Sequence, residues 1–155
     1  MTARRSPLHS MLPALLAISL SGVAAADGGV DVATASAPAG TDARIKQALS
    51  DSIRTQVGTA GLAPRLHGYR LSPALIQLRR FIEPGQKQPR TVCVVELGLN
   101  DGGGLLANVR GNASSFGASQ LATLDAAAHA AVDRLPETLS ALQNRPRARV
   151  ASSAF

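Results

Sequence analysis

The chain has 155 residues, with 16 Lys and Arg against 10 Asp and Glu, a formal net charge of +6 and a single cysteine. One cysteine excludes an intramolecular disulfide, so an exported domain of this size has to be held together by its apolar core. The modest positive charge favours weak contact with anionic surfaces, but it is too small and too dispersed to require a nucleic acid or membrane partner.

Residues 1–26 have the layout of a secretory signal peptide. Arg4 and Arg5 form a positive n-region, an apolar run covers 11–23, and small alanines at 24–26 precede Asp27. This run is shorter than the roughly 20 residues that a membrane-spanning helix needs, so the sequence offers membrane attachment only through an uncleaved signal segment. We therefore expect Sec-type export to the periplasm or the medium, and a mature chain that starts at Asp27.

The next segments predict a leader and a helix. Residues 27–41 consist mainly of Gly, Ala, Ser, Thr and Pro, which is typical of a flexible leader. Thr41 or Asp42 can cap the helix that follows, and Gly58 marks its end. Apolar residues recur every four positions along this helix, at Ile45, Leu49, Ile53 and Val57.

The middle of the chain predicts three antiparallel strands. The first covers 69–82, and its alternation slips at Arg79-Arg80, which indicates a bulge there. The second covers 91–99 and alternates strictly, so that one face carries Cys93, Val95, Leu97 and Leu99. The third follows a turn at 100–104, and its inward residues are Leu105, Ala107 and Val109.

The last part predicts a polar loop over 111–120, a closing helix from Leu121, and a basic disordered tail over 145–155. Pro136 has to kink the closing helix or start a new one. Together these elements predict one α+β domain over 42–144. It has two layers, with a three-stranded antiparallel sheet and an N-terminal and a C-terminal helix on one face.

Residues that carry chemistry are sparse. Cys93 lies between two valines in mid-strand, a position typical of a core residue rather than a nucleophile. Asp125 and His129 are four residues apart on the closing helix, and they support one alternative function, a small secreted hydrolase. No G-x-S-x-G motif supplies its nucleophile. His and Cys residues lack the spacing of a zinc site, and we expect neither a metal nor a cofactor.

The best candidate binding surface is a basic cluster around the predicted turn at 83–86. Its members are Arg79, Arg80, Lys87 and Arg90. This cluster supports a second alternative function, an anion-binding protein that contacts phosphates. Aromatic residues are nearly absent around it, so we expect no specific nucleic acid binding, because single strands bind on aromatic stacking platforms.

Three segments carry a family resemblance: the helix over 43–57, the hairpin over 92–113 with its Val109-Arg110-Gly111-Asn112-Ala113 ending, and the closing helix through Leu135-Pro136. They resemble small periplasmic α/β domains of Gram-negative envelope lipoproteins, of the CsgG-like and ABC-transport auxiliary types. The resemblance implies a mostly non-catalytic domain, although the chain lacks the lipobox cysteine of such lipoproteins.

The main hypothesis is therefore an exported, non-enzymatic envelope protein that binds or supports another envelope component. The predicted helices cover one face of the sheet and leave the other face free for a partner, and the sheet edge can accept a peptide. The partner is an envelope protein or an anionic surface, and the sequence leaves the oligomeric state open.

Overall fold

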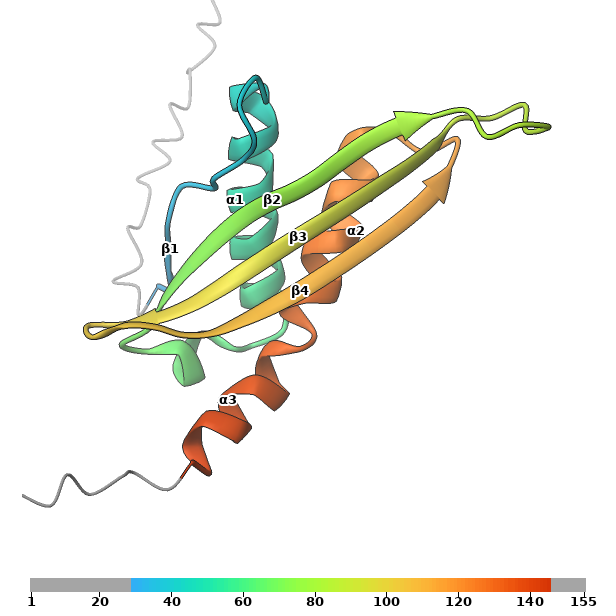
Figure 1. The fold of residues 1–155 in the computed structure, drawn as a ribbon. Helices are drawn as coiled ribbons and strands as arrows, with labels where there is room; N and C mark the ends of the chain where they lie inside the picture. The colour runs from blue at the N-terminus through green and yellow to red at the C-terminus, as the bar shows by residue number, and fades with distance from the viewer. Residues whose placement is uncertain (1–28, 146–155) are drawn as a thin grey trace, which may run out of the picture.

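The computed structural model describes residues 29–145. In chain order the elements are β1 (Asp31–Val32), α1 (Ala43–Thr59), the 3₁₀ helix η1 (Ala63–Leu66), β2 (Arg70–Phe81), β3 (Arg90–Asp101), β4 (Gly104–Phe116), α2 (Gln120–Val132) and α3 (Leu135–Gln143). Figure 1 shows α1 and α2 on one face of the sheet, with the opposite face bare. The predicted signal peptide and residues 146–155 of the predicted tail lie outside the described residues.

The sheet is mixed and has four strands in the order β1-β2-β3-β4, so the prediction of three antiparallel strands is wrong in number. β2, β3 and β4 are antiparallel as predicted, whereas β1 runs parallel to β2 with Val32 opposite Leu71. Val32 and Ala35 are buried, and the Ala35 amide donates to the Ser50 hydroxyl of α1 at 2.9 Å. Part of the predicted flexible leader is therefore a short edge strand, because a few small apolar side chains suffice to fill the space beside α1.

A β-bulge decides which side chains of β2 face the helices. The register with β3 shifts between Leu75 and Gln77, which leaves Ile76 unpaired and 44% exposed. Beyond the bulge the alternation moves by one position. This bulge lies closer to the strand start than the predicted bulge at Arg79-Arg80. In the resulting register Arg79 pairs with Val92 and lies on the bare outer face, whereas Arg80 pairs with Thr91 and lies on the helix-facing side.

The core lies between the sheet and the two parallel-running helices. The four inward residues predicted on β3, at positions 93, 95, 97 and 99, are all fully buried. Helix α2 packs tightly against the sheet at Gly111 of β4, where an added Cβ would lie 2.0 Å from the Ala127 carbonyl oxygen and 2.5 Å from the Ala131 amide nitrogen. Small residues on both sides of this contact therefore bring α2 directly onto β4.

The predicted closing helix is in fact two helices. α2 ends at Val132, and α3 begins at Leu135 with Pro136 in its first turn. Pro136 therefore starts a new helix and does not kink a continuous one. Leu135 and Leu139 are buried, so α3 extends the core at its end. β4 continues to Phe116, and most of the predicted polar loop at 111–120 is therefore strand.

Candidate functional site

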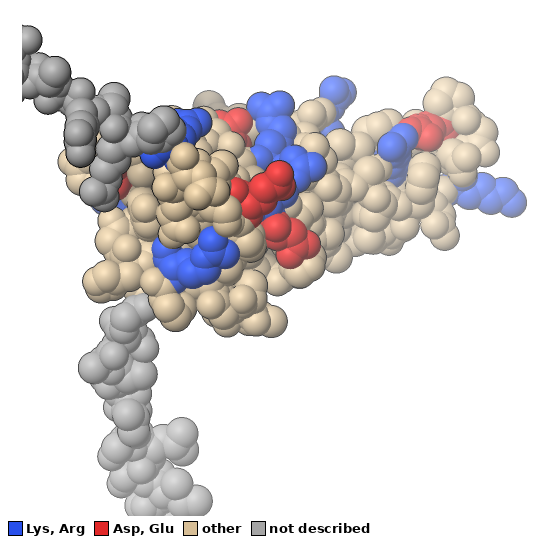
Figure 2. Space-filling view, turned by 90° about the horizontal axis from the view of Figure 1, so that it is seen from below, with Lys and Arg blue, Asp and Glu red and all other residues tan. Residues whose placement is uncertain are grey.

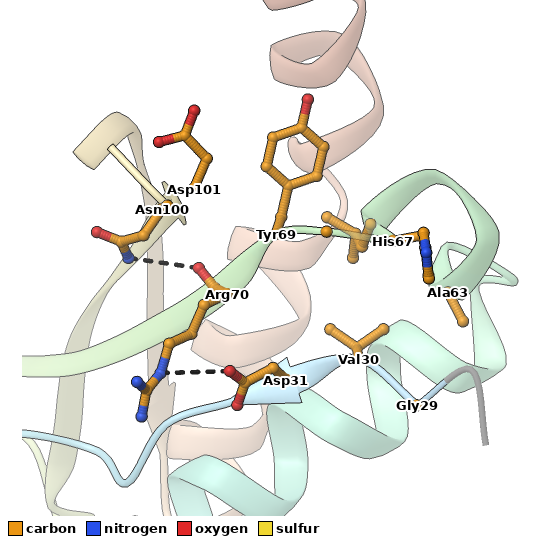
Figure 3. Close-up of a pocket in the computed structure, with 12 residues that line it drawn as sticks. Gly29, Val30, Asp31, Ala63, His67, Tyr69, Arg70, Asn100 and Asp101 are labelled. Atoms are coloured by element: carbon orange, nitrogen blue, oxygen red, sulfur yellow. Dashed lines mark hydrogen bonds and ion pairs between the residues drawn. The ribbon is translucent and has the colours of Figure 1, made fainter. Parts of the chain in front are cut away.

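An open pocket of about 450 Å³, which we call the end pocket, lies where β2 begins. It is formed by β1 and the two residues before it, by η1, by the start of β2 and by the turn between β3 and β4. Leu66 is buried at its base. Gly68 has a φ of +83°, which favours glycine, and it turns the chain from η1 into β2. The turn places His67 and Tyr69 in the pocket wall, as Figure 3 shows.

Polar side chains of both charges line this pocket together with the ring of Tyr69 (Figure 3). Asp31 Oδ2 lies 3.5 Å from Arg70 Nε, and the Asn100 amide donates to the Arg70 carbonyl oxygen at 3.3 Å. Asp101 accepts a hydrogen bond from the Gly103 amide at 2.8 Å. The Asp31 side chain is 63% exposed and that of Arg70 59%. A ring, two carboxylates and a guanidinium in an open pocket suit the non-covalent recognition of a partner with apolar and cationic groups.

The predicted basic cluster lies at the opposite end of the sheet, in residues 79–90, which we call the tip. The structure brings its four members to this end but not to one surface, because Arg79 pairs with Val92 on the outer face and Arg80 pairs with Thr91 on the other. Lys87 is exposed in the turn of the tip. Figure 2 shows basic and acidic residues interspersed over the face that it views. Anion binding by the cluster stays a prediction.

Arg90 has specific partners that the sequence analysis missed. Its guanidinium pairs with Glu83 at 2.6 Å, donates to the Ser114 hydroxyl at 2.7 Å, and lies 5.5 Å from the centre of the Phe116 ring. In the strand register Arg90 lies between Phe81 and Phe116, and both rings are exposed. Arg90 therefore makes a cation–π contact with Phe116, and the strand register places Phe81 on the other side of Arg90. Phe116 falls in the predicted loop over 111–120, and only the strand register shows that it lies opposite Arg90.

The predicted catalytic pair belongs to an exposed polar network between α1 and α2. Asp125 accepts from the Ser52 hydroxyl at 2.5 Å, whereas His129 Nδ1 bonds with Gln56 at 2.9 Å and its Nε2 lies 3.4 Å from Asp133. Both ring nitrogens of His129 thus have partners other than a serine. A hydrolase needs the imidazole within hydrogen-bond reach of its nucleophile. This geometry gives the hydrolase alternative no support.

Cys93 is fully buried, and burial raises the pKa of its thiol from 9.0 to about 11. Only the thiolate reacts with an alkylating agent, so at pH 8 this shift alone lowers the reactive fraction about 100-fold. We expect iodoacetamide to label Cys93 at least about 100-fold more slowly in the folded protein than in roughly 8 M urea, where the chain is unfolded. Equal rates would mean that Cys93 is accessible and that its strand face is wrongly assigned.

Within residues 29–145, no group of three or more His, Cys, Asp or Glu side chains is placed to hold a metal ion. None of the helices in the same range has the length and hydropathy needed to cross a membrane.

No protein family model and no curated protein matches the chain. Solved structures do match it. PelC of Paraburkholderia phytofirmans, which was solved as a dodecamer, has a TM-score of 0.52 and 18% identity over 77% of this chain and 88% of PelC. A Xanthomonas campestris protein of the DUF330 family has a TM-score of 0.49 and 15% identity over 74% of this chain and 85% of its own.

A candidate lipoprotein of Caulobacter crescentus has a TM-score of 0.47 and 14% identity, and covers 76% of this chain and 93% of its own. Identities of this size show a shared fold and nothing more, and of these three structures the PelC match, with its TM-score of 0.52, supports that statement. The resemblance to CsgG-like domains stays a prediction. The chain therefore has the fold of a PelC protomer.

Proposed function

We propose that the protein is an exported, non-catalytic accessory component of the bacterial envelope, and that it works as a homo-oligomer. The observation that carries the proposal is the shared fold with PelC, whose protomers assemble into a dodecamer. The layout of residues 1–26 supports export. The partners of the His129 ring, which are Gln56 and Asp133, and the burial of Cys93 both favour a binding role over a catalytic one.

The bare sheet face supports self-association. Antiparallel sheets commonly keep one face in solvent, but that face is usually polar. The outer face of this sheet carries polar residues such as the paired Glu96 and Arg110, but it also carries Phe81 and Phe116, which are 39% and 48% exposed. Val92 and Val94 on the same face are half-buried. Exposed apolar surface of this kind marks a site of protein contact.

The test expresses the full-length gene in a Gram-negative host and separates periplasm, membranes and cytoplasm. We expect the protein in the periplasmic or envelope fraction with Asp27 as its first residue. In sedimentation velocity it should run as one discrete species larger than a monomer. A cytoplasmic protein that keeps Met1 would contradict export, and a monomer at all concentrations would contradict the oligomer.

A further inference from the structure

We propose that copies of this chain associate head to tail, with the tip of one copy docked in the end pocket of the next. This inference rests on the proposed homo-oligomer and names the two surfaces that form it. Figure 1 shows the loop between β2 and β3 at one end of the long sheet and the start of β2 at the other. The tip and the end pocket therefore lie at opposite ends of the sheet, because the pocket is lined by the start of β2. One copy can therefore use both surfaces at the same time with two different neighbours.

The tip presents apolar side chains where nothing in the described chain covers them. Figure 1 shows the loop between β2 and β3 reaching beyond the ends of α1 and α2. Ile82 in this loop is 66% exposed, the highest value among the large apolar residues of the described part. Phe81 precedes it in the chain, and Phe116 lies at the same end of the sheet, across Arg90 in the strand register. A protruding hairpin with an exposed apolar side chain is suited to insert into a pocket.

The end pocket offers the matching apolar and polar groups. Val30, Leu66 and Tyr69 provide apolar lining, and the carboxylates of Asp31 and Asp101 stand in its wall. Its volume of about 450 Å³ lies within the range of pockets that enclose small ligands. It therefore has room for side chains of a neighbouring hairpin, with Ile82 of that hairpin as the apolar anchor.

Charge decides between the possible pairings of these surfaces. The tip carries four basic residues and one acid, Glu83, which gives a net charge of +3. The end pocket carries two acids and Arg70, which gives −1 with His67 neutral. Two tips repel each other, and so do two pockets, whereas a tip and a pocket attract. The favoured contact is heterologous, and such contacts form rings when their rotation closes.

The experiment uses one variant of each surface. Ile82→Asp places a charge on the apolar anchor, and Asp31→Arg reverses a carboxylate of the pocket. Both side chains are exposed, so circular dichroism and the melting temperature should stay those of the wild type. The matched controls are Leu121→Asp, which is 52% exposed outside the tip, and Asp51→Arg, which is 55% exposed on α1 and also paired with an arginine.

We expect each surface variant alone to sediment as a monomer, and each control to assemble as the wild type does. An equal mixture of Ile82→Asp and Asp31→Arg should form a 1:1 dimer and nothing larger, because one intact tip and one intact pocket remain. An oligomer that either variant leaves unchanged would overturn the inference. So would a mixture that stays monomeric, because it would show that the contact is not head to tail.

The same series separates this inference from the proposed function. A monomeric wild type would overturn the homo-oligomer and the inference together. A wild type that assembles while Ile82→Asp has no effect would overturn only the assignment of the surfaces. In that case the end pocket is left to another occupant.

Discussion

Replacing Gly111 with alanine should cost about 3 kcal/mol of folding free energy, at the upper end of the range for overpacked cores. The added Cβ would lie 2.0 Å from the Ala127 carbonyl oxygen and 2.5 Å from the Ala131 amide nitrogen. Both are backbone atoms of α2, so no flexible side chain can move aside and the whole helix has to shift. A domain of this kind has only about 5–15 kcal/mol of stability, so the loss is a large fraction of the total.

The matched control for this substitution is Gly58→Ala. An added Cβ at Gly58 in α1 meets no atom within 4 Å. Alanine is favoured over glycine in a helix by about 1 kcal/mol, so this variant should be slightly more stable than the wild type. Urea denaturation of both variants measures the difference. If Gly111→Ala unfolds at the wild-type urea concentration, α2 does not sit on β4 at this point.

Replacing Leu97 with alanine should cost about 2–5 kcal/mol, the range measured for large-to-small changes in cores. Leu97 is fully buried in mid-strand, where it lies between Pro73 on β2 and Val109 on β4. Leu124 and Val132 of α2 belong to the same core. The substitution therefore removes apolar contacts with both layers and leaves a cavity.

Val94→Ala on the same strand is the control for the face of the sheet. Val94 points to the outer side and is only half-buried, so the transfer term is smaller and no closed cavity forms. We expect its cost to be well below that of Leu97→Ala in the same urea experiment. Equal costs would show that both faces of β3 are covered, for example by another copy at the protein concentration used.

The regular elements could be predicted from the sequence because their signals are local. The four-residue spacing from Ile45 to Val57 predicted α1, and Asp42 caps it by accepting from the Arg44 amide at 2.8 Å. Alternation over 91–99 identified the buried face of β3. Pro136 predicted an interruption of the closing helix, because the proline ring does not fit inside a helix.

The features that failed depend on register and on distant contacts. A two-residue strand such as β1 has no periodicity to detect, and it exists because α1 and β2 provide a place for Val32. Leu105 was predicted to point inward but is 58% exposed, because the register with β3 shifts just before Asn100. One extra residue on a strand moves every later side chain to the other face.

The sequence predicted that the basic residues gather at one end of the sheet, but it did not predict their faces or the end pocket, because these depend on register and on distant contacts. The basic residues of the tip are adjacent in sequence to a turn, so their gathering at one end followed from the hairpin. Which of Arg79 and Arg80 faces outward did not, because that depends on the bulge at Ile76. The end pocket joins residues from three separate stretches of the chain, and no local pattern in the sequence marks such a site.

Native mass spectrometry of the protein purified from the envelope fraction tests the central claim most directly. One spectrum reports both where the chain begins and how many copies assemble. The account predicts a single assembly whose mass is a whole multiple of the chain that starts at Asp27. A monomer at every concentration, or a chain that still carries residues 1–26, would contradict it.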